Sequence, residues 1–228
     1  MTAIELRDVT VRLGDRVALD RVSLSLDHRR IAVIGANGSG KSTFARLLGG
    51  LVTAESGSAS VLGIDPAHRS TELRRRVGFV FSNPDAQIIM PTVAEDVAFS
   101  LRGERLPKAE SVARVAAALE RFGLGALADQ AAHDLSGGQK QLLALCAALI
   151  REPSLVIADE PTAYLDARNS RQIADHLLSD AGHDLVLVTH DLRMAGRCDV
   201  AVLFDAGRVV ASGQPDAVIE RYEALLSC

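Results

Sequence analysis

One stretch constrains this fold more than any other, the nine residues Gly35-Ala36-Asn37-Gly38-Ser39-Gly40-Lys41-Ser42-Thr43, named the phosphate loop below. An apolar run at 31–34 precedes it and a helical pattern follows from Phe44, which gives the order strand, glycine loop, helix. The glycines let backbone N–H groups turn towards phosphate oxygens, while Lys41 offers a positive charge and Ser42 offers a hydroxyl to Mg²⁺. The positive end of the helix dipole adds to the same site. The sequence therefore predicts a site for nucleotide phosphates.

The composition is that of an ordinary globular protein. Its 228 residues are 48 % hydrophobic, which is ample for a packed core, and the formal net charge is -4. That charge gives no bulk electrostatic reason to bind nucleic acid, so we expect no nucleic-acid partner. The cysteines are odd in number, far apart and without C-x-x-C spacing, which predicts reduced thiols in a cytosolic protein: Cys146, Cys198 and Cys228.

Neither a signal peptide nor a membrane span is expected. The first eight residues carry charges where a signal peptide needs an apolar stretch, and nowhere do about 18 apolar residues run together. We therefore expect the chain to serve any membrane process by docking onto a partner that spans the membrane.

The first third of the chain shows two kinds of strand pattern, one alternating and one continuously apolar. From Ile4 to Val11, and again at 22–26, apolar and polar residues nearly alternate, which predicts antiparallel strands with one wet face. The run 31–34 is continuously apolar, as a central strand covered on both faces requires, and 77–81 is a similar buried strand. The sequence therefore predicts a mixed β-sheet.

The pattern is helical from about Pro91 to Ile150. Apolar residues recur at helical spacing on two stripes, one at Val93, Val97 and Leu101 and one at Val112, Val115, Ala116, Leu119 and Phe122. Since no strand-like run interrupts them, we predict a helical subdomain.

After Pro153 the strand pattern returns, at 155–158, 185–188, 200–204 and 208–211, followed by a helix from Pro215. The last two strands read as a hairpin. We therefore predict a single domain, 1–228, in which a helical subdomain at about 82–151 is inserted into an α/β core formed by 1–81 and 152–228.

Two acidic residues, Asp159 and Glu160, end the apolar run 155–158. A loop after a buried strand can direct both carboxylates at the phosphate site. Asp159 would hold Mg²⁺ through water, and Glu160 would orient and deprotonate an attacking water. Alone, the pair is explained equally well by a helix N-cap; beside the phosphate loop, we assign it the catalytic role.

A second glycine-rich helix start, named the signature motif below, comprises Leu135-Ser136-Gly137-Gly138-Gln139. A serine hydroxyl, unpaired backbone N–H groups and a helix dipole make an anion site that can bind a γ-phosphate. The alternative is an ordinary capped helix.

The chain resembles the ATP-binding cassette (ABC) ATPases over essentially its whole length. The resemblance is carried, in order, by the phosphate loop, the signature motif, Asp159-Glu160-Pro161-Thr162, Leu165-Asp166 and Thr189-His190-Asp191. It implies an α/β fold with a P-loop NTPase core, a mixed sheet, an antiparallel β subdomain and the inserted helical subdomain of an ABC nucleotide-binding domain.

The resemblance also implies roles for individual residues. In this family two subunits form a head-to-tail dimer that sandwiches ATP between one phosphate loop and the partner's signature motif. By position, Glu160 becomes the water-activating base, His190 the switch that reads the γ-phosphate, and Asp166 a cross-dimer link. A homodimer is the simplest assembly, with a heterodimer as the alternative.

Two positions depart from the family pattern. Ser82 stands where the family usually has a glutamine that touches Mg²⁺ and senses the membrane partner, and its hydroxyl has a shorter reach. Gln87 lies too far along the chain to be taken as its replacement. Leu13 stands where the family commonly stacks an aromatic ring on adenine, so we expect apolar contact there and looser base selectivity.

Within the family, the segments 81–88, 92–99 and 140–145 look most like the ATPases of energy-coupling factor (ECF) importers, which take up vitamins and transition-metal ions. We expect an ATPase using ATP and Mg²⁺, peripheral at the cytoplasmic face of the membrane, with transmembrane and substrate-binding subunits as partners. The chain stops about one helix after its final hairpin, which favours biotin as cargo, with cobalt or nickel next.

Two other functions stay open at this point. One is a soluble ABC ATPase of DNA repair or translation, against which stand the lack of a long coiled-coil insertion and the single cassette. The other is a nucleotide-gated binding module with little hydrolysis. Glu160 and His190 are evidence against this function, whereas Ser82 and Leu13 favour it.

Overall fold

The computed structural model describes residues 2–179 and 182–226, so Cys228 lies outside it. A three-stranded antiparallel sheet has the order β2-β1-β4, built from β1 (Thr2–Leu13), β2 (Arg16–His28) and β4 (Ser56–Val61). On β1 the alternating residues Ile4, Leu6, Val9 and Val11 are buried, while Glu5 and Arg7 are exposed. The predicted one-sided antiparallel strands are confirmed.

A second sheet has six strands in the order β5-β6-β7-β3-β8-β9. All its neighbours pair in parallel except β8 and β9, so the predicted mixed sheet is confirmed. The strands are β3 (Arg30–Gly35), β5 (Val77–Val80), β6 (Leu155–Asp159), β7 (Asp184–Val188), β8 (Val200–Asp205) and β9 (Arg208–Gly213). Because β3 lies between β7 and β8, the apolar run 31–34 is fully buried.

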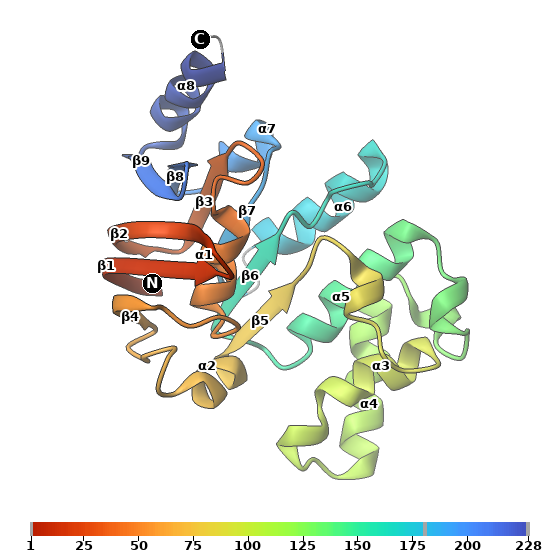
Figure 1. The fold of residues 1–228 in the computed structure, drawn as a ribbon. Coiled ribbons are helices and arrows are strands. Elements are labelled where there is room, and N and C mark those ends of the chain that lie inside the picture. Colours follow the sequence, from red (N-terminus) through yellow and green to blue (C-terminus); the bar gives the residue numbers. More distant parts are fainter. Residues whose placement is uncertain (1, 180–181, 227–228) are drawn as a thin grey trace.

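Five helices belong to the α/β part of the chain, α1 (Lys41–Leu48), α2 (Ser70–Arg76), α6 (Ala167–Leu178), α7 (Leu192–Ala195) and α8 (Pro215–Leu226). Figure 1 places α1 between the two sheets. Phe44, Leu47 and Leu48 of α1 share one buried cluster with residues of β1 and β3, and the rings of Phe44 and Phe204 lie 5.0 Å apart. This packing fixes the start of α1 against the end of β3.

A separate layer beyond β5 and β6 contains the helices α3 (Val93–Ser100), α4 (Lys108–Arg121) and α5 (Gly137–Leu149) (Figure 1). Short 3-10 turns flank them at Pro84–Ala86, Arg102–Glu104, Gly125–Leu127 and Ala132–Asp134. The described chain has no strand between β5 and β6. The expected helical subdomain is present beside the mixed sheet and the antiparallel β subdomain.

One detail of the helical prediction is wrong. Val112 is 60 % exposed and Ala116 is exposed, so neither lies on the buried stripe of α4. The buried residues are Val115 and Leu119, and the half-buried Arg114 on the same side reaches the carbonyl of Ile150 at 2.8 Å. Since successive residues are turned by about 100° in a helix, a face that includes Arg114 turns away from Val112 and Ala116.

No helix in residues 2–179 and 182–226 is long and apolar enough to cross a membrane.

Candidate functional site

The phosphate loop joins the end of β3 to the start of α1, and its glycines hold backbone angles that other residues avoid. Gly35 has φ 143° and Gly40 has φ 109°. A Cβ atom on Gly35 would lie 2.1 Å from the carbonyl oxygen of Phe204, on the neighbouring strand β8. Only glycine fits there, because an L side chain would be strained by the angle and blocked by the strand.

The carbonyl groups of the phosphate loop are turned to partners within the chain. Lys41 Nζ donates to the carbonyls of Gly35 and Ala36 at 2.7 and 2.9 Å, and Arg16 donates to that of Gly38. The backbone N–H groups of Gly207 and Phe44 donate to the carbonyls of Ser39 and Gly40, both at 2.9 Å. The first N–H groups of α1 have no acceptor inside the helix and can bind an anionic ligand.

Lys41, the first residue of α1, is 6 % exposed. Burial lowers the pKa of Lys41, and the charges of Glu160 and Asp159 act in the opposite direction. An ammonium group removed from water attracts a phosphate more strongly than an exposed one. The geometry therefore suits a ligand with several negative charges.

Asp159 is the last residue of β6 and is 4 % exposed. Its Oδ1 accepts a hydrogen bond of 2.9 Å from the hydroxyl of Ser42 on α1. Burial raises the pKa of Asp159, and the Ser42 hydrogen bond is the largest of the effects that oppose this rise. A hydroxyl and a carboxylate held together supply the oxygen ligands that Mg²⁺ prefers, so this donor set fits the ion.

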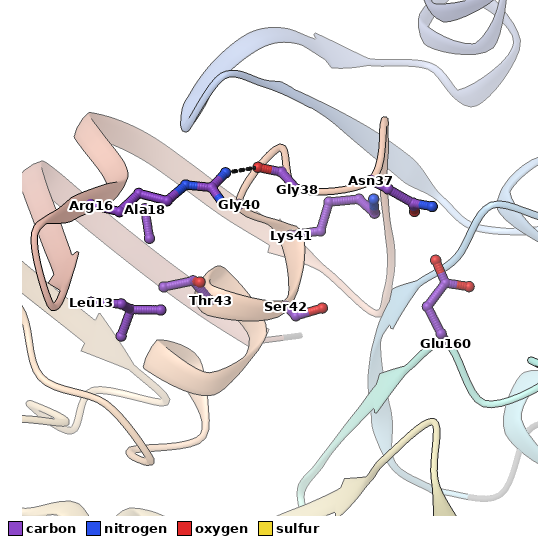
Figure 2. Close-up of a pocket in the computed structure, with 10 residues that line it drawn as sticks. All are labelled: Leu13, Arg16, Ala18, Asn37, Gly38, Gly40, Lys41, Ser42, Thr43 and Glu160. Atoms are coloured by element: carbon purple, nitrogen blue, oxygen red, sulfur yellow. Dashed lines mark hydrogen bonds between the residues drawn. The ribbon is translucent and has the colours of Figure 1, made fainter.

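Glu160 follows directly, at the carboxyl end of β6, with φ 52°. Its N–H donates to the carbonyl of Val188 at 2.9 Å, and its Oε2 lies 2.7 Å from Nδ1 of His190. The backbone N–H of His190 donates to the same oxygen at 3.3 Å. In Figure 2 the Glu160 carboxylate lies across from Lys41. Two strands that end at one edge of the sheet thus bring the predicted base and switch together.

A pocket of about 190 Å³ lies in front of the phosphate loop (Figure 2). Its lining residues are Leu13, Arg16, Ala18, Asn37, Gly38, Gly40, Lys41, Ser42, Thr43 and Glu160. The sequence predicted most of them, but Arg16 and Ala18 had no motif to mark them. Leu13, 44 % exposed, lies at the position where the sequence comparison expected a base contact.

The signature motif lies elsewhere in the chain, at the start of α5. Ser136 is its N-cap: Ser136 N–H donates to Gln139 Oε1 at 2.8 Å and Gln139 N–H donates back to the Ser136 hydroxyl at 3.3 Å. Ser136 and Gly137 are exposed, whereas Gly138 is buried. None of the described residues that line the pocket belongs to this motif, so one chain by itself does not bring the two predicted sites together.

Asp166 caps the start of α6. Its carboxylate accepts hydrogen bonds of 2.9 Å from the backbone N–H groups of Arg168 and Asn169, and one of 2.8 Å from the Asn169 side chain. These bonds, the Asn169 backbone N–H first, lower the pKa of Asp166. A Cβ atom on Gly138 would lie 2.5 Å from the Asn169 amide, so the signature motif packs against this cap.

Ser82 lies half-buried just beyond β5 and does not line the pocket. Gln87, set aside by the sequence analysis, instead holds the segment that contains Ser82. Its Oε1 accepts from Phe81 N–H at 3.2 Å, and its Nε2 donates to the carbonyls of Phe79 and Ala144 at 3.2 and 3.1 Å. Gln87 is therefore a structural brace between β5 and α5.

The fold and site are those of a nucleotide-hydrolysing cassette. The family profile described as ABC transporter matches residues 19–163, and the chain therefore belongs to the ABC transporter family. Its activity is ATP hydrolysis coupled to transport.

Three relatives are similar over nearly the whole chain. An ABC transporter ATP-binding protein of Deinococcus radiodurans is 44 % identical and covers 96 % of both chains. The biotin transport ATP-binding protein BioM of Rhizobium etli is 41 % identical, covering 97 % of this chain and 98 % of its own. The nickel import ATP-binding protein NikO of Rhodobacter capsulatus is 40 % identical, covering 96 % and 92 %. The chain is thus close to the ATPases of ECF-type transporters.

Solved structures that share the fold include the following two. CbiO1 of Clostridium perfringens, described as part of the CbiONQ transporter complex, has a TM-score of 0.84 at 31 % identity and covers 98 % of this chain and 93 % of its own. The cassette MJ0796, solved as a dimer bound to ADP and phosphate, has a TM-score of 0.82 at 29 % identity, covering 93 % and 98 %.

Proposed function

We propose that the protein is the Mg²⁺-dependent ATP-hydrolysing subunit of a micronutrient importer, working as a homodimer at the cytoplasmic face of the membrane, with biotin as cargo. The observation that carries the catalytic part is the pair formed by Glu160 and His190, 2.7 Å apart: Glu160 lines the same pocket as Lys41 and Ser42, and Ser42 is hydrogen-bonded to Asp159. Phosphate binding, charge neutralisation and water activation then have separate residues.

Each side chain has one task in this proposal. Lys41 leaves the loop carbonyls to bind the β and γ phosphates, and the N–H groups at the start of α1 bind the remaining oxygens. Ser42 directly and Asp159 through water would hold Mg²⁺, which neutralises charge on the phosphate oxygens when bound. Glu160 orients a water for attack and accepts its proton, while His190, held by Glu160, contacts the γ-phosphate.

The assembly follows from what one chain lacks. The signature motif offers an exposed serine and a helix N-terminus for a γ-phosphate, yet it does not line the pocket of its own chain. A second copy can supply it, and two identical chains related by a two-fold axis make two equivalent composite sites. The dimer of the similar cassette MJ0796 supports this assembly.

A groove beside β5 suits the membrane partner. It is lined by Phe79 and Gln87 together with two exposed apolar side chains, Ile89 at 61 % and Phe99 at 37 %. Exposed apolar side chains gathered in one groove mark a protein interface. We assign a helical segment of the membrane-spanning subunit as occupant. The similar CbiO1, part of a transporter complex, supports this choice.

Biotin is the first choice of cargo, because BioM matches this chain at 41 % identity along 98 % of its own length. Nickel is the second candidate, supported by NikO at 40 % identity, and cobalt is the third, which rests on the resemblance to ECF importers described in the sequence analysis. No residue of an ATPase subunit touches cargo, so the choice rests on the relatives.

The test starts with recovery of the tagged chain from detergent-solubilised membranes. A membrane-spanning protein should be recovered with wild type and lost with Ile89→Asp, whereas Val210→Asp, a matched change at a 42 % exposed valine on β9, should keep it. Recovery of ribosomes or DNA with no membrane protein would overturn the proposal.

Cells that express the recovered complex should then take up labelled biotin and not nickel or cobalt ions, and uptake should stop with Lys41→Ala.

A further inference from the structure

The pocket has a phosphate end and an opposite end whose ligand contact is unassigned. Lys41, Ser42 and Glu160 mark the phosphate end, whereas Leu13, Arg16 and Ala18 come from the hairpin of β1 and β2 (Figure 2). A nucleotide whose phosphates bind the loop must extend its base towards that hairpin. None of the described residues that line the pocket is aromatic, so the base has no ring to stack on.

Arg16 extends from that hairpin to the phosphate loop and supplies a flat surface between the two. Its side chain donates a hydrogen bond to the carbonyl of Gly38, as Figure 2 shows. A Cβ atom on Gly38 would lie 3.4 Å from Arg16 Nη2, which means that the guanidinium packs directly against the loop backbone. The side chain is exposed apart from this contact, and Leu13 lines the pocket beside it.

The hydrogen bond to Gly38 occupies one edge of the guanidinium of a side chain that is otherwise exposed. The five N–H donors of an arginine lie in the plane of the group, so a donor can hold the carbonyl while a face stacks on a ring. A long side chain normally loses rotamer freedom when it binds a ligand, and a bond made beforehand reduces that cost. Arg16 is therefore pre-ordered for stacking.

We propose that Arg16 is the base-binding residue of this protein: its guanidinium face stacks on the nucleobase, with Leu13 as the adjoining apolar contact. This inference rests on the ATP-binding function and adds the residue that recognises the base. A guanidinium attracts the face of any aromatic ring, through charge and through dispersion, so the contact favours nucleotides over free phosphates and discriminates weakly among bases.

The test compares ADP with pyrophosphate, which has the phosphates but no base, by calorimetric titration of the full chain. Stacking on a guanidinium at an exposed site corresponds to about 2- to 5-fold in affinity. Arg16→Ala should therefore weaken ADP by about that factor and leave pyrophosphate unchanged. Arg7→Ala, at an exposed arginine of β1 that pairs with Glu5, should alter neither affinity.

Two further variants separate stacking from other roles. Arg16→Lys keeps the charge and a donor but has no flat face, so it should lose ADP affinity nearly as Arg16→Ala does. Leu13→Tyr combined with Arg16→Ala should restore ADP binding, because a ring beside the same position replaces the lost face.

Four results would overturn the inference. If Arg16→Ala weakened pyrophosphate as much as ADP, Arg16 would act only by bracing the phosphate loop. Full ADP affinity in Arg16→Lys would assign charge or hydrogen bonding in place of stacking. ADP binding that Arg16→Ala leaves unchanged would contradict this inference alone, whereas wild type that binds neither ADP nor pyrophosphate would contradict the proposed function as well.

Discussion

The hydroxyl of Ser42 and the carboxylate of Asp159 meet at 2.9 Å, although 117 residues separate them along the chain. Asp159 is 4 % exposed at this contact, and burial raises its pKa, which means that the fold holds a carboxylate charge at a cost. Binding of the Mg²⁺ that we propose for this site would offset that cost.

Asp159→Asn should therefore stabilise the nucleotide-free protein while stopping hydrolysis. The amide keeps the size of the carboxylate and an oxygen that accepts from Ser42, but it has no charge to desolvate. We expect an increase of about 0.5–2 kcal/mol in the free energy of unfolding, measured by urea denaturation at pH 7.5. Asp191→Asn, a matched change at a more exposed helix cap, should not stabilise the protein. Equal or lower stability of Asp159→Asn would show that the buried charge is already compensated.

Glu160→Gln should keep ATP bound and slow its hydrolysis. The change removes the base but preserves the shape and one oxygen facing His190, so the loss should be about 10²–10⁴ in turnover, as expected for general-base catalysis. Lys41→Ala is the counterpart, because it should abolish nucleotide binding itself. Turnover and ATP affinity measured on both variants check the assignment, and wild-type turnover in Glu160→Gln would show that another group activates the water.

Much of this site could be predicted from local patterns. The phosphate loop, its preceding apolar strand and the acids after β6 each occupy a short stretch of sequence, and their types of structure followed from periodicity and glycine spacing. The mixed sheet was predictable for the same reason: the continuous run 31–34 differs visibly from the alternation along β1.

What escaped prediction depends on distant pairing. Arg16 reaches Gly38 across 22 residues, and Gln87 reaches Ala144 across 57, so neither side chain carries a local pattern that states its partner. The wrong prediction for Val112 has a similar cause. Its spacing was compatible with burial, but Arg114 contacts Ile150 on the packed side of α4, and Val112 lies on the exposed side. Periodicity gives a stripe, and tertiary packing selects which edge of the stripe is covered.

Two inactive variants should complement each other if the composite site is correct. Ser136→Arg blocks the signature motif and Lys41→Ala disables the phosphate loop, so a mixed dimer should contain one intact site made from the undamaged halves. ATP turnover of the mixture should recover to about half of wild type per mixed dimer if the two sites act independently. A mixture that stays inactive, although mixed dimers are detected by differential tags, would contradict either the head-to-tail arrangement or the independence of the two sites.

His176 on α6 should make stability depend on pH. Its ring stacks on Phe122 with centroids 4.4 Å apart, and burial, together with the charge of Arg121, lowers the pKa of His176 below 6.5 while Asp175 opposes the shift. The folded state then binds a proton less readily than the unfolded chain, so the stabilising contribution is present above pH 6.5 and is lost as the pH falls through the lowered pKa. His176→Phe keeps the stack without the proton.

The measurement is the thermal midpoint of wild type and His176→Phe between pH 8 and pH 5. The thermal midpoints of the two proteins should change in parallel above pH 6.5. Below pH 6.5 the midpoint of wild type should fall faster than that of His176→Phe. His68→Phe, at an exposed histidine paired with Asp65, is the matched control and should not remove the steeper fall. Parallel profiles for wild type and His176→Phe would rule out this histidine as the cause.

Ser82 should matter only modestly, because it lies half-buried beyond β5 and outside the residues that line the pocket, in a segment that Gln87 already holds in place. If the Ser82 hydroxyl reaches Mg²⁺ through water, it supplies one neutral hydrogen bond worth about 0.5–1.5 kcal/mol, so Ser82→Ala should lower ATP turnover of the complete transporter by about 2- to 10-fold. Ser82→Gln should be tolerated, since the longer amide can reach Mg²⁺ from the same backbone position.

Gln87→Ala provides the contrast: it leaves the Phe79 and Ala144 carbonyls without this donor and should destabilise the segment as well as coupling. Turnover measured against Mg²⁺ concentration separates these effects, and a collapse of Ser82→Ala to the level of Glu160→Gln would make the Ser82 hydroxyl an indispensable Mg²⁺ ligand.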